Sequence, residues 1–150
     1  MFGFFYSAMA KKKTNLSDYN AAGIPSGAGI KIAIVVSEWN PEITESLYSA
    51  AHETLLSHGC KEKNIFRTNV PGSFELPAGA QFMIEKKNYD AVICLGCVIQ
   101  GETRHFDFIC QAVANGLVQL ALKYNKPFIF GVLTPNNMEQ ARARAGGKHG

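Results

Sequence analysis

The sequence lacks the features that would place it in several large classes of protein. Its four cysteines in 150 residues are too few for a disulfide-stabilised scaffold. Its net charge of +3, from 15 basic and 12 acidic residues, is too small to indicate nucleic-acid binding by itself. The apolar stretch over residues 1–10 is too short to cross a bilayer, and lysines follow it, whereas a signal peptide carries its positive charge first. We therefore expect neither a nucleic-acid partner nor a membrane partner.

Motifs of cofactor and metal chemistry are also absent from the sequence. It has no phosphate-binding loop of the G-x-x-x-x-G-K-S/T type, no G-x-G-x-x-G after a strand and no G-x-S-x-G nucleophile elbow. No group of histidines, cysteines and carboxylates has the spacing of a metal site. We therefore expect no metal and no cofactor.

Two of the cysteines, Cys94 and Cys97, have the C-x-x-C spacing of redox pairs, but they lie inside the apolar run AVICLGCVI. Redox pairs of this spacing lie at the start of a helix. In a strand, residues three apart face opposite sides, so the two thiols would diverge. We expect buried, reduced thiols and a cytoplasmic protein.

Beyond residue 30 the chain alternates between short apolar runs and amphipathic stretches. Pro41 suits the first position of a helix, Asn40 its N-cap and Gly59 its C-terminal exit. Near-continuous apolar strands that alternate with helices indicate an α/β fold, a parallel sheet covered on both faces, in one domain over residues 31–150. The predicted strands are 31–36, 64–70, 90–99 and 127–133, and the predicted helices are 41–59, 77–86, 105–124 and 136–146.

Residues 1–30 are predicted to be a tail followed by an extended arm. The segment 15–30 is polar at first and then rich in Gly and Ala, and its apolar side chains have no periodic face. We expect this arm to cover the sheet edge of an adjacent copy, because unpaired edges of small sheets need covering. Met9 would be a more ordinary first residue, so we interpret residues 1–8 as an upstream start.

The candidate site is predicted at the carboxyl ends of the strands, where open parallel sheets bind ligands. Trp39, the only tryptophan, comes at a strand-to-helix turn. It either caps the edge of the core or forms a stacking platform for a planar heterocycle. Glu75, at the end of the turn PGSFE, has a carboxylate that accepts hydrogen bonds from the hydroxyls of a sugar or polyol.

The segment 101–105, GETRH, precedes the longest predicted helix. Its glycine allows close backbone approach, and unpaired N–H groups at a helix start favour an anion. His105 is then within reach of the same ligand, and histidine is the side chain best suited to move protons near neutral pH. The alternative is a helix-capping Thr103 beside a surface histidine. Arg142 and Arg144 face different directions on the last helix, and their spacing does not decide which one points to the anion.

Five segments occur together in one order: KIAIVVSEWNPEIT, VPGSFELP, LGCVIQGETRHFDFI, PFIFGVLT and EQARARAGGKHG. Jointly they resemble the lumazine synthase family of riboflavin biosynthesis over about residues 15–150. The resemblance implies a flavodoxin-like three-layer α/β/α fold with a four-stranded parallel sheet and no metal or redox cofactor. It also implies a transferase that condenses 5-amino-6-ribitylaminouracil with 3,4-dihydroxy-2-butanone 4-phosphate. The products are 6,7-dimethyl-8-ribityllumazine, phosphate and water.

The resemblance further implies roles for the residues that bind the pyrimidine substrate. Trp39 falls where the family stacks an aromatic ring on the pyrimidine. Ser73 and Glu75 fall where it binds the ribityl chain, and Val98 and Ile99 line the heterocycle pocket.

The same resemblance implies roles in phosphate binding and proton transfer. His105 matches the family's proton-transferring histidine, and Phe130 matches an aromatic that reaches the site from a neighbouring subunit. Arg144, rather than Arg142, matches its phosphate-binding arginine. The phosphate loop corresponds to Gly101, Glu102 and Thr103.

The family's sites lie between adjacent subunits of a pentamer, and some members assemble a shell of 60 subunits. We therefore expect a homopentamer that takes small-molecule substrates. Two alternatives remain: a related riboflavin synthase, which dismutates two lumazines, and a non-catalytic flavin-binding or shell-forming protein. The sequence departs from the family pattern at Ala143, where an acid usually precedes the arginine. The family also continues past position 150 with a basic segment and a final helix.

Overall fold

The computed structural model describes residues 20–149. Its centre is a parallel sheet of four strands in the order β2-β1-β3-β4. The strands are β1 (Ile32–Ser37), β2 (Ile65–Val70), β3 (Ala91–Cys97) and β4 (Phe128–Leu133). All six residues of β1 are buried, as expected of a central strand between two helical layers. The predicted α/β class and the flavodoxin-like strand order are confirmed.

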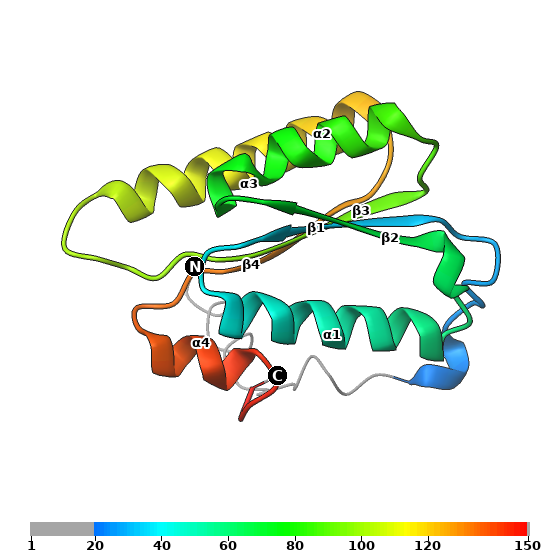
Figure 1. Ribbon diagram of the computed structural model, residues 1–150, viewed down its shortest axis with the longest axis horizontal. Helices are drawn as coiled ribbons and strands as arrows, with labels where there is room; N and C mark the ends of the chain where they lie inside the picture. The colour runs from blue at the N-terminus through cyan, green and yellow to red at the C-terminus, as the bar shows by residue number, and fades with distance from the viewer. Residues whose placement is uncertain (1–19, 150) are drawn as a thin grey trace, which may run out of the picture.

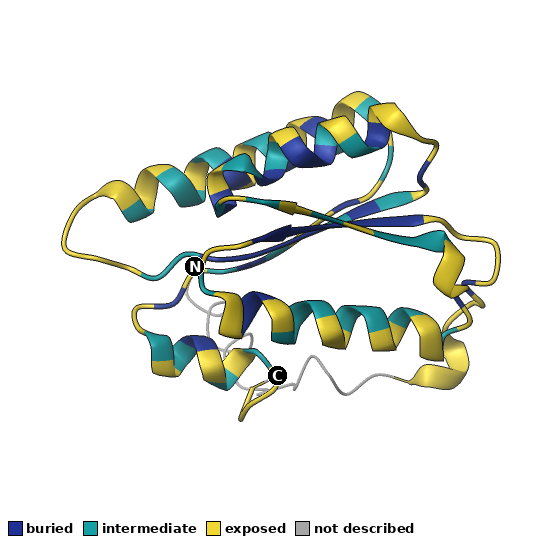
Figure 2. Cartoon of the chain, viewed as in Figure 1, coloured by how far each residue is buried: buried dark blue, intermediate teal, exposed yellow. Residues whose placement is uncertain are grey.

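Two helices cover each face of the sheet (Figure 1). On one face lie α2 (Leu76–Lys86) and α3 (His105–Tyr124), and on the other lie α1 (Pro41–Ser57) and α4 (Met138–Arg144). Figure 2 shows the buried residues gathered on the sheet and on the helix sides that face it. The main core lies under α2 and α3 around Leu76, Val92 and Val113, each with no exposed surface. The predicted three-layer arrangement is therefore confirmed.

The thiols of Cys94 and Cys97 diverge as predicted. Cys94 joins the core under α2 and α3, whereas Cys97 packs with Ile43 and Ala141 on the opposite face. Both are free and buried, and burial raises the pKa of Cys94 to about 12 and that of Cys97 to about 11. Neither thiol is ionised at neutral pH.

The ends of α1 follow the predicted residues, with one correction. Pro41 opens the helix, and Gly59 leaves it with a positive φ of 88°. Asn40 does occupy the N-cap, but its side chain makes no capping hydrogen bond. Instead Asn40 has a left-handed backbone, φ 57°, and its side-chain amide donates to the carbonyl of Cys97 at 3.0 Å. The side-chain amide of Asn40 thus links the tight turn between β1 and α1 to the end of β3.

The described part of the predicted arm, residues 20–30, lies beside the end of α1. It contains a single 3-10 turn, η1 (Ala21–Gly23), and the amide of Gly27 donates to the carbonyl of His58 at 2.8 Å. This segment therefore contacts its own chain, which the sequence analysis did not foresee. The prediction for residues 1–19 lies outside the described residues.

Gly116, on α3, allows α2 and α3 to pack closely. A Cβ at this position would lie 2.8 Å from Cβ and Cγ of Pro77, the second residue of α2. Packing of α3 against α2 within one chain therefore explains why the longest helix has a glycine in its middle.

Candidate functional site

A cavity of about 710 Å³ opens at the carboxyl ends of β1, β2 and β3. It has contributions from the β1–α1 turn, from the turn after β2, from the end of β3 and from the first turns of α3. The cavity lies outside the strand ends of the parallel sheet, where the sequence analysis expects a ligand to bind. The lining residues are Trp39, Asn40, Gly72, Phe74, Glu75, Cys97, Val98, Ile99, His105 and Ile109.

Five of the predicted site residues line this cavity: Trp39, Glu75, Val98, Ile99 and His105. They come from four separate segments, which the crossovers of the fold bring to one edge of the sheet. The cavity therefore combines an aromatic ring, a carboxylate, an aliphatic floor and an imidazole.

The indole of Trp39 projects from the surface, with 70% of the residue exposed. The backbone on either side of it is fixed. The amide of Glu38 extends the sheet by donating to the carbonyl of Val70 at 2.9 Å, and Asn40 is tied to Cys97 as described above. An exposed ring on a fixed turn can stack on a planar ligand with little ordering of the backbone. Of the two sequence interpretations, the stacking platform fits this exposure better than the core cap.

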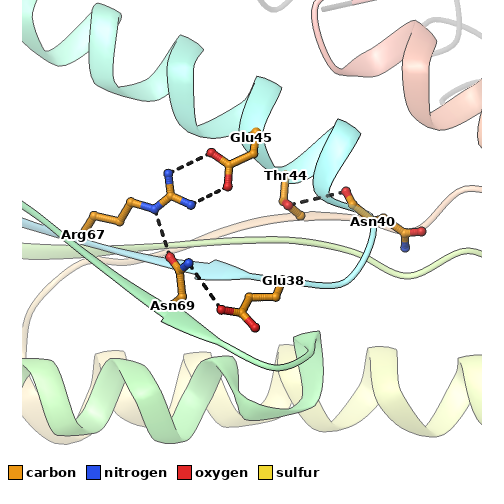
Figure 3. Close-up of polar contacts among 6 residues, drawn as sticks. All are labelled: Glu38, Asn40, Thr44, Glu45, Arg67 and Asn69. Atoms are coloured by element: carbon orange, nitrogen blue, oxygen red, sulfur yellow. Dashed lines mark hydrogen bonds and ion pairs between the residues drawn. The ribbon is translucent and has the colours of Figure 1, made fainter.

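A chain of polar contacts runs from α1 across β2 to Glu38, the residue before Trp39 (Figure 3). The guanidinium of Arg67 on β2 makes two hydrogen bonds to the carboxylate of Glu45 on α1, and its Nε donates to Oδ1 of Asn69 at 2.9 Å. Asn69 in turn donates to Oε1 of Glu38 at 3.5 Å. The hydrogen bonds from Arg67 hold the pKa of Glu45 below its usual value. The ring of Tyr48 packs beneath the same guanidinium, 4.3 Å from its carbon.

The turn after β2 presents Ser73 and Glu75, which lie in η3 (Ser73–Glu75). Oε2 of Glu75 accepts a hydrogen bond from the amide of Gly72 at 2.9 Å, which fixes the carboxylate at the cavity wall. Ser73 is buried, and among residues 20–149 its hydroxyl has no hydrogen-bond partner. Ser73 is not among the cavity-lining residues, but an unpaired buried hydroxyl beside the cavity gains from a ligand that reaches it.

The segment before α3 is exposed, and His105 is the first residue of the helix. The N-cap of α3 is Arg104, which makes no side-chain capping hydrogen bond, and the amide of His105 donates to Oγ1 of Thr103 at 3.4 Å. A Cβ on Gly101 would meet nothing within 4 Å, so packing within the described chain does not require this glycine. The amides of Asp107 and Phe108 both donate to the carbonyl of Arg104, at 3.1 and 3.3 Å, so the start of the 20-residue α3 favours an anion mainly through the positive end of its helix dipole.

The two arginines of α4 have different surroundings. Arg142 forms an ion pair with Glu42 of α1, with Nε 2.6 Å from Oε1, and its hydrogen bonds lower the pKa of Glu42. Arg144 donates to the carbonyl of Gln140 at 3.1 Å and lines a second hollow, which lies beyond the end of β4. One chain therefore does not bring Arg144 to the cavity of His105.

Phe130 also lies away from the main cavity. It is on β4, an edge strand, and is 43% exposed. Four other predicted residues do not line the cavity, although residues close to them in sequence do: Ser73, Gly101, Glu102 and Thr103.

Sequence reasoning missed five lining residues: Asn40, Gly72, Phe74, Cys97 and Ile109. Three of them lie in segments that it had singled out, next to Trp39 or Glu75, and were omitted because their types carry no evident chemistry. Cys97 and Ile109 have no such signal, since burial in a strand or helix explains their apolar character equally well.

The described residues contain neither a group placed to bind a metal ion nor a helix that could span a membrane. Residues 20–149 contain no group of three or more histidine, cysteine, aspartate or glutamate side chains placed to hold a metal ion. Across the same residues, no helix is both long and apolar enough to cross a membrane.

Comparison with known proteins adds an independent finding. Residues 29–150 match the family model described as 6,7-dimethyl-8-ribityllumazine synthase. A 6,7-dimethyl-8-ribityllumazine synthase of Cytophaga hutchinsonii is 61% identical over 142 residues, which cover 95% of this chain and 89% of the relative. Relatives with the same name from Flavobacterium johnsoniae and Parabacteroides distasonis are 51% and 49% identical, each over 95% of this chain and over 75% and 89% of their own lengths.

Proposed function

The chain belongs to the 6,7-dimethyl-8-ribityllumazine synthase family, and on this premise we propose that its cavity binds the two substrates of that reaction. The enzyme is a transferase of riboflavin biosynthesis. It condenses 5-amino-6-ribitylaminouracil with 3,4-dihydroxy-2-butanone 4-phosphate and releases 6,7-dimethyl-8-ribityllumazine, phosphate and water. The observation that carries the assignment of the site is that Trp39, Glu75 and His105 line one cavity although they lie on three different segments.

The pyrimidine substrate needs a stacking surface for its ring and hydrogen bonds for its ribityl chain. The exposed indole of Trp39 supplies the first. The carboxylate of Glu75 and the unpaired hydroxyl of Ser73 supply the second, with Val98 and Ile99 as the apolar wall beneath the ring. A substrate hydroxyl that reaches the buried Ser73 hydroxyl would give a hydrogen-bond partner to a group that otherwise lacks one.

We place the phosphate of the second substrate at the start of α3, against the backbone of Gly101, Glu102 and Thr103. The partial positive charge of a helix N-terminus stabilises a phosphate there. Arg144 supplies a full positive charge. Since Arg144 lines a different hollow of its own chain, the Arg144 that serves a given cavity belongs to an adjacent copy.

The reaction needs proximity and proton transfer rather than a strong nucleophile from the protein. The 5-amino group of the pyrimidine attacks the ketone carbon, and a first water leaves as the C=N bond of a Schiff base forms. A proton then leaves the carbon next to the C=N bond, and its electron pair expels phosphate from the terminal carbon. The enol that remains tautomerises to a ketone. The ribitylamino nitrogen attacks the new carbonyl, and a second water leaves as the ring closes. His105, at the cavity wall and near the phosphate loop, moves protons in these steps.

The active unit is proposed to be a ring of five copies. Large apolar side chains on α3 and on the edge strand β4 support an interface, among them Phe108, Val118, Leu122, Ile129 and Phe130, each at least 43% exposed. In this ring Phe130 and Arg144 of one copy complete the cavity of the next. A heterologous contact of this kind has to close on itself. The cytoplasm, which keeps thiols reduced, suits the four free cysteines.

A turnover assay with both substrates tests the function. The proposal predicts a product with the absorbance and fluorescence of a ribityllumazine, together with release of inorganic phosphate. Formation of riboflavin from ribityllumazine alone would instead support the riboflavin synthase alternative. Binding of flavin without any turnover would support the non-catalytic alternative.

A further inference from the structure

Gly72 separates two of the groups that bind the pyrimidine substrate. A Cβ at Gly72 would lie 3.2 Å from Cδ1 and 3.8 Å from Nε1 of Trp39, and 3.1 Å from Oε2 of Glu75. The indole and the carboxylate therefore approach one α-carbon, and both are at contact distance from the space that a side chain would fill.

The backbone conformation does not explain this glycine. Gly72 has φ −141° and ψ 176°, which is extended chain that any residue adopts. Its amide donates to Glu75, a hydrogen bond that any residue except proline can make. The reason for glycine must be the space around it.

The neighbours of Gly72 differ from those of the glycines in the core. A Cβ at Gly96 would lie 2.6 Å from Oγ of Ser73 and 3.0 Å from a methyl group of Leu76, both buried, so side chains there conflict with packing. At Gly72 the nearest groups line a cavity, and Trp39 is 70% exposed. A methyl group added at position 72 can push the exposed indole outward with little loss of folding free energy. The displaced indole would, however, no longer lie where it stacks on the substrate ring.

We propose that Gly72 is a positioning residue, whose missing side chain lets the indole of Trp39 and the carboxylate of Glu75 take up the ring and the ribityl chain of one substrate together. This inference rests on the proposed function of the cavity. It assigns to Gly72 no contact with the substrate and no role in proton transfer.

The direct test is the variant Gly72→Ala, with Gly29→Ala as the matched control, because a Cβ at Gly29 would meet nothing within 4 Å. Trp39 is the only tryptophan, so its emission and its quenching by acrylamide report the ring position directly. We expect both signals to change in ligand-free Gly72→Ala and to stay unchanged in Gly29→Ala. The KM for the pyrimidine should rise about tenfold, while the KM for the butanone phosphate stays within about twofold.

A rescue experiment separates positioning from a general disturbance. Trp39→Ala removes the whole ring that a methyl group at position 72 would meet, whereas phenylalanine would keep a Cδ1 atom at the same branch. The increase in KM caused by Gly72→Ala should therefore be smaller in the Trp39→Ala background than in the natural chain.

Three results would overturn the inference: unchanged Trp39 emission together with an unchanged KM, an equal effect of Gly72→Ala in both backgrounds, or a fall in the unfolding temperature by more than about 5 °C. The last result would show that Gly72 serves packing. Failure of the proposed function would appear differently, as no turnover by the natural chain, and the emission of the ligand-free variants would still test the ring position.

Discussion

The side-chain amide of Asn40 donates to the backbone carbonyl of Cys97 at 3.0 Å, and so ties the turn that carries Trp39 to the end of the neighbouring strand β3. Asn40 can serve this purpose because its backbone is left-handed, a conformation that asparagine tolerates better than most residues. One side chain thus sets the relation between the stacking platform and the floor of the cavity, which begins at Val98.

This relationship predicts different results for two substitutions of Asn40. Asn40→Ala loses the hydrogen bond and also strains the backbone, so the free energy of unfolding should fall by about 1–3 kcal/mol. Asn40→Gly keeps the left-handed conformation and loses only the hydrogen bond, so it should cost less. Urea denaturation of both variants checks the order. Equal losses would show that backbone strain contributes nothing at this turn.

A second prediction concerns His105. Its replacement by alanine should lower kcat by roughly 10²-fold, because general acid–base catalysis contributes on this scale. His52→Ala is the control and should leave kcat unchanged, because His52 lies on α1, where its ring stacks on Tyr48 and contacts Glu62, and does not line the cavity. If His105 carries the protons, the pH dependence of kcat should also change in His105→Ala. A mutant profile identical to that of the natural chain would exclude this role.

Trp39 gives a third prediction, which can be checked without measuring enzyme activity. Binding of 6,7-dimethyl-8-ribityllumazine or riboflavin should quench its emission, since the ligand ring would stack on the indole. Trp39→Ala should weaken binding by about 1–3 kcal/mol, taking base–aromatic stacking as the analogue, whereas Trp39→Phe should retain most of the affinity. Titration of the natural chain checks the quenching and calorimetry checks the variants. Emission that stays constant at saturating ligand would count against stacking.

The fourth prediction distinguishes Arg144 from Arg142. Arg144→Ala should raise the KM for the butanone phosphate and leave the KM for the pyrimidine almost unchanged, because loss of a charge-assisted contact costs about 1.5–3 kcal/mol. Arg142→Ala is the matched control, since Arg142 pairs with Glu42. A similar rise in both KM values for Arg144→Ala would argue against a phosphate site.

Because the proposed site is shared, Arg144→Ala and His105→Ala lie on opposite sides of it. Rings assembled from a mixture of the two variants should contain some sites with neither substitution. When the butanone phosphate is well below its KM, such mixed rings should be more active than either variant alone. Activity that stays at the level of the separate variants would contradict sharing between copies.

The ion pair between Glu45 and Arg67 predicts that the free energy of unfolding depends on pH in the acidic range. The hydrogen bonds from Arg67 lower the pKa of Glu45 in the folded chain, so folding is favoured above the pKa of the unfolded state. That contribution is lost as the pH falls from the unfolded value, near 4.3, through the lower folded value. Glu45→Gln should therefore show a shallower fall of the unfolding free energy over this range. Equal slopes for the variant and the natural chain would contradict the assignment.

Much of the fold was predictable because its signals are local. Pro41 and Gly59 mark the ends of α1, and continuous apolar runs mark strands buried on both faces. Two features escaped prediction because they depend on tertiary contacts. The turn at Asn40 resembles an ordinary N-cap in sequence, but its amide has a better partner on β3. Gly116 suits close helix packing around an axis in sequence, but the neighbour that requires it is Pro77 of the same chain.

The candidate site was predictable in its location and in its most distinctive residues. Trp39 and His105 stand out because a lone tryptophan at a turn and a histidine at a helix start are hard to explain by packing. Gly72 does not, since the effect of a missing side chain is visible only once its neighbours are placed. The hollow that contains Arg144 could not be separated from the cavity of His105 by spacing, because the positions of β4 and α4 relative to α3 are set by the whole fold.

The most direct test of the account is a crystal structure of the protein with 6,7-dimethyl-8-ribityllumazine and inorganic phosphate bound. We predict that the lumazine ring lies against Trp39, the ribityl chain at Ser73 and Glu75, and the phosphate at residues 101–103. We also predict that Arg144 of an adjacent copy reaches that phosphate. A ligand bound elsewhere, or a complete site formed within one copy, would contradict these predictions.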